Sequence, residues 1–393
     1  MVVLIFFLEM ISRQQSELQS GDILNLFETM AILIGKTQLS LSDQKEYLIA
    51  VIAPHVSSIN DLISSSELIR DPESFGEVLA TLIAAISCLS KGFSKPCAEI
   101  KSIMVETVPI LLAALKALPA DERVRVKTIV TLHRMILVLG HDILNPITPF
   151  LQILIFHCSY NDITDVTQLL NQLCSKFKSS VVQTINAAVI PFLQKCHSII
   201  PENDNNNEIA PHLDTEQLLV RKLGFVFLQH IVSKKATEVL VSEINKPNLE
   251  NVLAEMKYGA VEVVDPNIRK SCILFFRGLL DQWSEVGNVD DIIRTGFLGF
   301  ITSSLLPDLL KGVMNPNFDV SDAMNIRVVV QTSKLLEILQ AQYHSHYNHF
   351  MGNFLQNSGC AASTATAFSS GSTSVEIEKC LLQMREDILN NVR

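Results

Sequence analysis

Residues 265–283 read DPNIRKSCILFFRGLLDQW, and this stretch decides the fold class. Asp265 is a favourable N-cap residue, and Pro266 suits the first helical position because its missing N–H would have no partner there. Apolar side chains then recur at helical spacing along one stripe of about four turns: Ile268, Cys272, Phe275, Phe276, Leu279 and Trp283. The stretch therefore predicts an α-helix that is buried along one face.

The same helical spacing extends over most of the chain. Nearly every apolar run follows it, and almost none alternates as a β-strand would. Asp214 followed by Gln217 resembles a capping box, which predicts a helix from there through Val232. That helix is apolar almost all round, so we expect it to lie between neighbouring helices.

A proline pattern indicates internal repeats. An apolar residue or Thr, then Pro, then a mostly apolar segment recurs at Pro109, Pro149, Pro191 and Pro307. The first three prolines are 40 and 42 residues apart, and the gap of 116 residues to Pro307 leaves room for about two further units. A period near 40 is typical of HEAT or armadillo repeats, and Asp265 to Lys270 resembles the Asp…Val-Arg signature of the second HEAT helix. The predicted fold is an all-α, HEAT-type α-α superhelical solenoid.

Two polar segments interrupt the helical pattern. Pro201 to Pro211 is rich in Asn and bracketed by prolines, which predicts an exposed loop. Asn357 to Ser374 is rich in Ser, Thr, Ala and Gly. We therefore expect HEAT-like repeats over residues 1–356, a flexible low-complexity insertion over 357–374, and a terminal helix over 375–393.

The composition limits the function classes. The 393 residues include 31 Lys and Arg against 41 Asp and Glu, so 31 − 41 gives a net charge of −10. This excludes a generic basic nucleic-acid binder, although a local basic strip is compatible with it. Charged residues make up 18% of the chain, below the roughly 25% usual for soluble domains. Such a chain hides much of its surface internally or has it covered by partners.

The sequence contains no strong signal for a membrane span or for secretion. The apolar opening, Met1 to Leu8, is far shorter than the roughly 20 residues that span a bilayer, and it lacks the basic flank of a signal peptide. We expect no membrane insertion.

The eight cysteines form no CxxC pair and sit mostly among apolar residues, which favours free thiols in a reducing compartment.

Catalytic motifs are not found in the sequence. Gly35-Lys36-Thr37 ends like a P-loop, but Met30 occupies the position of the first glycine, so we interpret Gly35 as a helix C-cap. His344, His346 and His349 lie close together without a nearby Cys or carboxylate to complete a metal site, which favours a surface cluster. We expect no enzymatic activity, no cofactor and no bound metal.

Basic residues recur near predicted helix ends. Arg123, Arg125 and Lys127 precede the His133-Arg134 pair, and Lys176 and Lys178 flank Phe177. Arg221-Lys222 and Arg269-Lys270 recur near the starts of later predicted helices. Equivalent positions line up along one edge of a solenoid, so scattered pairs can form a strip that follows phosphates. The alternative is that these residues are solvated or form the Asp–Arg ladder between HEAT repeats, for which Arg269 is the clearest candidate. The sequence leaves both interpretations open.

Short stretches in a shared order resemble one family. They are Lys91 to Ser94, Thr131 to Met135, Leu170 to Gln172 with Lys176 to Lys178, Arg221-Lys222, Phe227 to Gln229, and Gly259 to Glu262 with Asp265-Pro266. In these positions the chain resembles the C-terminal part of exportin-T, a karyopherin of the importin-β type. The resemblance fades after about Asn315, and Phe318-Asp319 and Asp322-Ala323 are its last good matches.

This resemblance implies a nuclear export receptor that binds the backbone and shape of tRNA together with Ran-GTP and releases the tRNA in the cytoplasm. It implies a protein that shuttles between nucleus and cytoplasm and contacts nuclear pore components. The phosphate-contact candidates by resemblance are Lys91, Arg134, Lys176, Lys178, Arg221 and Lys222.

The length of the chain modifies these expectations. Exportins of this family are much longer, and their N-terminal repeats carry the main Ran-binding surface. We therefore expect this chain to correspond to only the C-terminal part of such a receptor. The alternative function is a HEAT-repeat scaffold or a karyopherin with protein cargo, in which the basic residues occupy ladder positions.

Overall fold

The computed structural model describes residues 20–65, 71–94, 96–199, 211–285, 287–358, 368 and 372–391. Every regular element in these ranges is a helix, which confirms the all-α prediction. The helices divide into two compact units, the first made of residues 1–177 and 183–220 and the second of residues 178–182 and 221–393.

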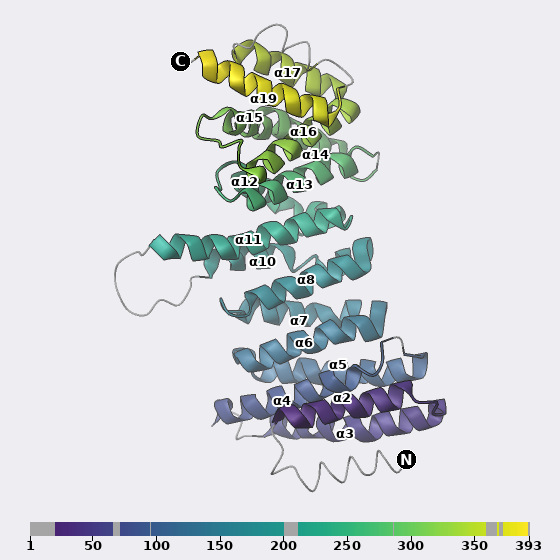
Figure 1. Ribbon diagram of the computed structural model, residues 1–393. Helices are drawn as coiled ribbons and strands as arrows, with labels where there is room; N and C mark the ends of the chain where they lie inside the picture. Colours follow the sequence, from purple (N-terminus) through teal and green to yellow (C-terminus); the bar gives the residue numbers. More distant parts are fainter. Residues whose placement is uncertain are drawn as a thin grey trace. The chain divides into compact units, whose positions relative to one another are not determined.

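The first unit consists of paired helices in two layers (Figure 1). In one layer each helix packs against the next: α2 (Ser20–Lys36), α4 (Pro72–Ser90), α6 (Glu122–Leu139) and α8 (Ile163–Phe177). The other layer is built in the same way: α3 (Leu41–Ser64), α5 (Ala98–Ala117), α7 (Leu144–His157) and α10 (Val189–Ser198). Short segments join them: η2 (Gly140–Ile143) and α9 (Val182–Ile185). This succession of helix pairs is a HEAT-like solenoid, as predicted.

The second unit repeats the arrangement. Its first layer contains the part of α11 (Pro211–Ser233) that follows Val220, then α13 (Pro266–Trp283), α16 (Ala323–Gln342) and α19 (Ser374–Asn391). Its second layer contains α12 (Leu249–Val261), then α14 (Asp291–Phe300), which continues through the π-helical η6 (Ile301–Leu305) into α15 (Leu306–Met314), and α17 (His344–Ser358). The short 3₁₀ segments are η3 (Lys178–Val181), η4 (Thr237–Val241) and η5 (Lys246–Asn248).

The proline repeat marks one layer of each unit. Pro109 lies inside α5, Pro149 inside α7 and Pro191 in the first turn of α10, so the spacing of about 40 residues measures one helix pair. Pro307 begins α15. Pro54, inside α3, extends the series beyond the predicted positions.

The opposite layer is marked by aspartate caps. The carboxylates of Asp71, Asp121, Asp265 and Asp322 accept backbone N–H groups at the starts of α4, α6, α13 and α16. Such caps satisfy N–H groups that have no partner within the helix. The HEAT-like signature noted at Asp265 is therefore shared by several helices of the same kind.

The predicted apolar stripe on residues 265–283 is the core of the second unit. Phe275, Phe276 and Trp283 are fully buried, as are Cys272 and Leu279. The helix predicted to start at Asp214 begins at Pro211 instead, because proline also suits the first turn. Its later part is buried on several sides, at Phe225, Phe227, Leu228, Ile231 and Val232.

Three predictions concern residues beyond the described ranges. The apolar opening at Met1 to Leu8 and nearly all of the loop from Pro201 to Pro211 lie outside them, as does most of the 357–374 insertion. Within that insertion Phe368 is described and buried, and its carbonyl accepts a hydrogen bond of 3.2 Å from the hydroxyl of Tyr347.

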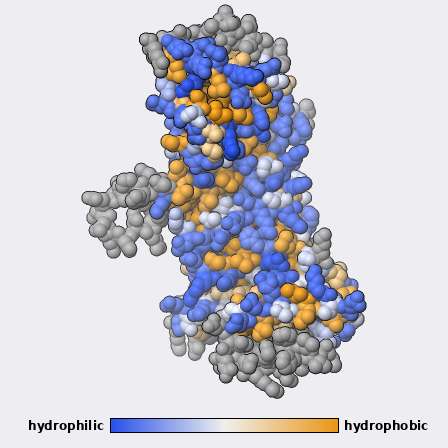
Figure 2. Space-filling view, in the orientation of Figure 1, coloured by the Kyte–Doolittle hydropathy of each residue, from blue (hydrophilic) through white to orange (hydrophobic). Residues whose placement is uncertain are grey.

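Four helical stretches are long and apolar enough to cross a membrane, judged by length and composition alone: Leu41–Ser64, Pro72–Ser90, Glu122–His157 and Asp291–Met314. From the sequence we expect no membrane insertion, and these stretches were not identified there. In this fold the stretches form parts of the solenoid layers, and 56% of the most apolar one, in α4, is buried among neighbouring helices. Figure 2 shows hydrophilic and apolar side chains interspersed over the face in view.

Candidate nucleic-acid interface

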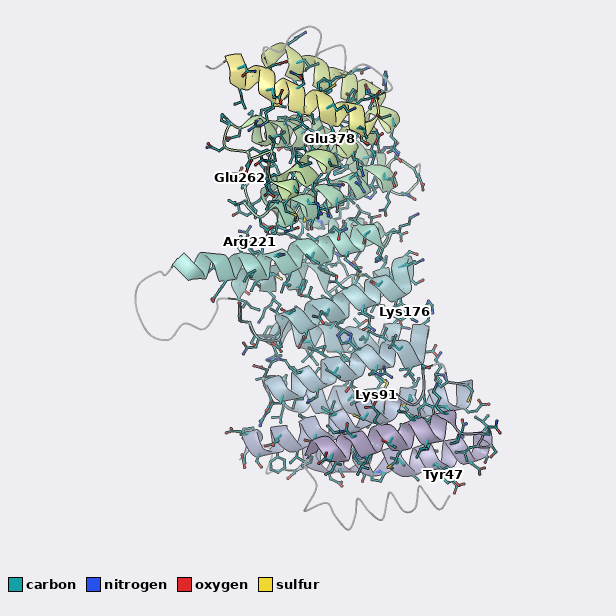
Figure 3. The ribbon with its side chains drawn as sticks, viewed as in Figure 1. Tyr47, Lys91, Lys176, Arg221, Glu262 and Glu378 are labelled. Atoms are coloured by element: carbon teal, nitrogen blue, oxygen red, sulfur yellow. The ribbon has the colours of Figure 1, made fainter. Side chains whose placement is uncertain are left out.

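Three of the predicted phosphate contacts belong to the α2–α4–α6–α8 layer of the first unit. Lys91 follows the last turn of α4, Arg134 lies in α6, and Lys176 lies in the last turn of α8 (Figure 3). Since these helices pack side by side, their exposed faces form one surface. The fold therefore brings residues separated by up to 85 positions onto a common layer.

Lys91 is partly neutralised by its neighbour. Its Nζ lies 2.5 Å from a carboxylate oxygen of Glu28 on α2, and both side chains are about one-third exposed. Exposed ion pairs of this kind contribute about 0–1 kcal/mol. A phosphate competing for Lys91 therefore has a weak partner to displace.

Arg134 has no ion-pair partner among the described residues, and its Nε is buried without a hydrogen bond there. Its charge acts on the nearby Cys88. Burial raises the pKa of the Cys88 thiol, while Lys91, Lys127 and Arg134 oppose this effect. Three cations and the carboxylate of Glu28 thus act on Cys88.

Lys176 and Lys178 are exposed, and neither forms an ion pair within the described part of the chain. Lys178 has a φ of 51°, a left-handed conformation that a lysine adopts at a cost of about 1–2 kcal/mol. The two lysines fall in different units, Lys176 in the first and Lys178 in the second.

Arg221 and Lys222 are engaged within the second unit. The Arg221 guanidinium donates to one oxygen of Glu255, at 3.2 and 2.8 Å, and lies 4.3 Å from the centre of the Tyr258 ring. Lys222 pairs at 3.5 Å with Asp265, the cap of α13. Both cations therefore connect α11 to the following helices.

A buried ion pair holds α6 to the start of α8. Arg125, grouped with the exposed basic residues, has a side chain only 3% exposed and pairs at 2.5 Å with the fully buried Asp162. It also donates to the carbonyls of Pro119 and Ala120. Of the interpretations that the sequence left open, the Asp–Arg ladder between repeats therefore applies to Arg125, because its burial keeps it out of a surface strip. A pairing between residues 37 positions apart has no local sequence signal.

Arg269 lies one turn after the capping Asp265, just as Arg125 lies one turn after the capping Asp121. Its Nε donates to the carbonyl of Ala260 in α12, and its guanidinium lies 5.5 Å from the centre of the Phe318 ring. It links helices as a ladder residue would, but its partners are a carbonyl and an aromatic ring.

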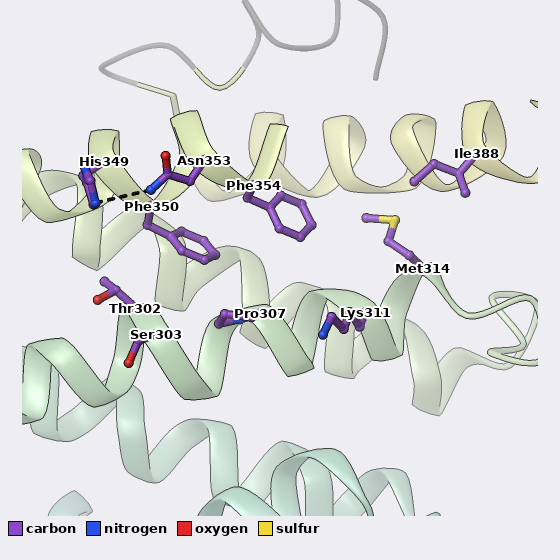
Figure 4. A pocket seen from close by; sticks show the side chains of 10 residues that line it. All are labelled: Thr302, Ser303, Pro307, Lys311, Met314, His349, Phe350, Asn353, Phe354 and Ile388. Carbon is purple, nitrogen blue, oxygen red and sulfur yellow. Dashed lines mark hydrogen bonds between the residues drawn. The ribbon is translucent and has the colours of Figure 1, made fainter. Parts of the chain in front are cut away.

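The second unit also contains a cavity of about 570 Å³ between α15, α17 and α19 (Figure 4). Thr302, Ser303, Pro307, Lys311, Met314, His349, Phe350, Asn353, Phe354 and Ile388 line it. Ser303 donates to the carbonyl of Gly299 in its own helix, and the His349 ring lies 3.3 Å from the amide of Asn353. No carboxylate is among these lining residues, so the serine and histidine lack the third group of a catalytic triad.

The histidine cluster lies on the surface of α17. His344, His346 and His349 are all exposed, and His344 contacts Asn348. Within the ranges that the structure describes, no group of three His, Cys, Asp or Glu side chains is arranged to hold a metal ion.

Paired helices in two layers, with prolines in one layer and capping aspartates in the other, define an α-solenoid of HEAT-like repeats. The exportin-T family model matches residues 10–382. The chain belongs to the exportin-T family.

Relatives named Exportin-T come from distant organisms. The protein of Danio rerio is 24% identical over 348 residues, which cover 86% of this chain and 35% of the relative. The human protein is 25% identical over 337 residues, 83% of this chain and 34% of its own length. The protein of Oryza sativa subsp. japonica is 26% identical over 353 residues, covering 86% and 35%. The chain thus spans about one-third of the length of these relatives.

Proposed function

We propose that this chain is the tRNA-holding part of a nuclear export receptor. In this proposal it binds the backbone and shape of tRNA cooperatively with Ran-GTP, passes the nuclear pore by contacting pore components, and releases the tRNA in the cytoplasm. The receptor shuttles between nucleus and cytoplasm, acts as a carrier and not as an enzyme, needs no cofactor, and does not insert into a membrane. Membership of the exportin-T family is the observation that carries the proposal.

The distribution of charge supports an RNA partner. The chain carries a net charge of −10, so a polyanion is repelled except where cations are locally in excess. Arg134, Lys176 and Lys178 supply positive charge that no carboxylate of the described residues neutralises through an ion pair. Such cations suit the phosphates of an A-form helix, which proteins recognise by shape and backbone.

One observation favours the scaffold alternative. Lys91, Arg221 and Lys222 pair with Glu28, Glu255 and Asp265 on neighbouring helices, which is the arrangement expected for cations that only hold repeats together. In the scaffold interpretation the cargo is a protein and the exposed lysines are merely solvated.

Charge reversal distinguishes the two functions. The double substitution Lys176→Glu and Lys178→Glu is expected to weaken tRNA binding by about tenfold or more at 0.1 M salt, because two phosphate contacts become repulsive. The matched control is Lys45→Glu with Lys116→Glu, which changes two exposed lysines of the α3–α5 layer by the same charge. Fluorescence anisotropy with labelled tRNA measures both variants. Equal affinities of the two variants would favour the scaffold.

A further inference from the structure

A polar groove of about 470 Å³ lies over α11, α13 and α16 in the second unit. Three cations line it, one from each helix or the turn after it: Lys235, Arg277 and Lys334. Its floor is tight because α11 approaches α13 closely at Gly278, where a Cβ would lie 2.4 Å from a methyl carbon of Val232. The groove is thus fixed by helix packing and does not depend on a loop.

The row of cations extends along both helices. On α13, Leu274, Arg277 and Asp281 face the groove, so Lys270, four residues before Leu274, lies on the same side. The Arg277 guanidinium donates a hydrogen bond to the amide oxygen of Gln331, which lies on α16. Arg327, four residues before Gln331, therefore shares a face with Lys334.

We name these five residues the α13–α16 basic face: Lys235, Lys270, Arg277, Arg327 and Lys334. None of the five forms an ion pair with any described residue, whereas Arg221 and Lys222 on α11 are both paired. Lys235, directly after α11, is exposed and held in a left-handed conformation with a φ of 59°. The cations of this face are thus unpaired, whereas the two residues of α11 that the resemblance indicated are paired.

Two carboxylates line the same groove, and both have other donors. The side chain of Gln342 donates to Asp281 at 3.3 Å, and the backbone N–H of Ser374 donates to Glu337 at 2.9 Å. Three cations and two carboxylates line the groove, so 3 − 2 gives +1, and Lys270 and Arg327 add positive charge on α13 and α16 beside it, on a chain whose total is −10. This local excess attracts an anionic partner.

The geometry favours a nucleic-acid backbone. Cations seven residues apart on a helix are separated by about 10 Å, and packed helices lie about 8–10 Å apart, so the face presents a regular array of charges. No aromatic side chain is among the lining residues, which removes the platform on which the bases of single strands stack. The remaining chemistry suits the phosphates of a double-helical RNA stem.

We propose that the α13–α16 basic face binds the phosphate backbone of a tRNA stem, an inference that rests on the proposed function. Lys270 and Arg327 contact one end of the stem segment, and Arg277, Lys334 and Lys235 contact the other. Arg221 and Lys222 then serve to join α11 to α12 and α13 and do not contact RNA.

The test compares two charge-matched double variants. Lys270→Gln with Lys334→Gln removes two cations of the basic face. Lys246→Gln with Lys311→Gln removes two exposed lysines of η5 and α15, which pair with Asp290 and Asp308. Binding of labelled tRNA is measured between 50 and 200 mM salt. The first variant is expected to flatten the slope of log affinity against log salt by about 1.5, since each lost contact removes about 0.7–0.9. The control variant is expected to keep the wild-type slope.

Three other outcomes would contradict the basic face, the proposed function or the RNA assignment. A wild-type slope in the Lys270→Gln, Lys334→Gln variant contradicts the basic face while leaving the proposed function intact. Absence of tRNA binding by the unmodified chain contradicts both. Poly-glutamate that displaces tRNA from the chain at equal charge concentration shows that the face binds acidic peptides, and overturns the RNA assignment.

Discussion

Arg125 and Arg277 carry the same charge on helices of the same type but meet different surroundings. Arg125 is enclosed and paired with Asp162, and breaking such a buried pair costs about 3–5 kcal/mol. Arg277 lines a groove, and among the described residues its partner is the neutral amide of Gln331. The first residue therefore stabilises the fold, and the second is available to a ligand.

The reactivity of individual cysteines tests which of them are buried. Cys97 is exposed at the start of α5, whereas burial raises the pKa of the Cys158 thiol to about 11. The thiolate is the reactive form, so iodoacetamide at pH 8 is expected to modify Cys97 and to leave Cys158 intact in the native chain. Site-resolved mass spectrometry measures the two rates, and equal rates would contradict the described packing.

The same shift sets a pH dependence. In the folded state the pKa of Cys158 lies above its ordinary value of 9.0, so folding favours the protonated thiol. Its contribution to stability is complete below about pH 9 and is lost as the pH rises toward 11.

At the scale of the helix, the capping aspartates connect sequence to packing. Burial alone would raise the pKa of Asp265, but the N–H of Asn267 and the charge of Lys222 outweigh this effect and hold it below its ordinary value. The carboxylate thus caps α13 and pairs with α11 at once. Its contribution is present above about pH 4 and is lost as the pH falls through the lowered pKa.

Two substitutions separate the cap from the charge. Asp265→Ala is expected to lower the free energy of unfolding by about 1–2 kcal/mol, because it removes the hydrogen bond to Asn267. Asp265→Asn keeps a capping oxygen and loses only an exposed ion pair, so it is expected to cost about 1 kcal/mol less. Urea denaturation measures both. Equal losses would show that the cap contributes nothing.

The helices could be predicted from the sequence because their signals are local. Pro109, Pro149 and Pro191 are visible as a repeat, and Asp265-Pro266 is visible as a helix start. The contact between α6 and α8 could not be predicted, since Asp162 lies 37 residues after Arg125 and nothing nearby indicates that they meet. Of the basic face, the sequence indicated only Lys270, because Arg277 and Lys334 become neighbours only when α13 packs against α16.

At the scale of the whole molecule, the family assignment could be made from short ordered stretches, and the match over residues 10–382 confirms it. The candidate site could be predicted only in part. Lys176 and Lys178 are exposed as a contact requires, whereas Arg221 and Lys222 are neutralised by partners on other helices. Whether a cation is free depends on side chains that the fold brings together.

A solenoid with a net charge of −10 can hold RNA only where positive charge is local. In the proposed function, this chain holds the tRNA backbone through a small number of such contacts. The most direct test is the salt dependence of tRNA binding by the unmodified 393-residue chain, measured between 50 and 200 mM salt. Four or more phosphate contacts predict a slope of log affinity against log salt of about −3 or steeper. A slope near zero, or no binding at the lowest salt, would contradict the proposed function.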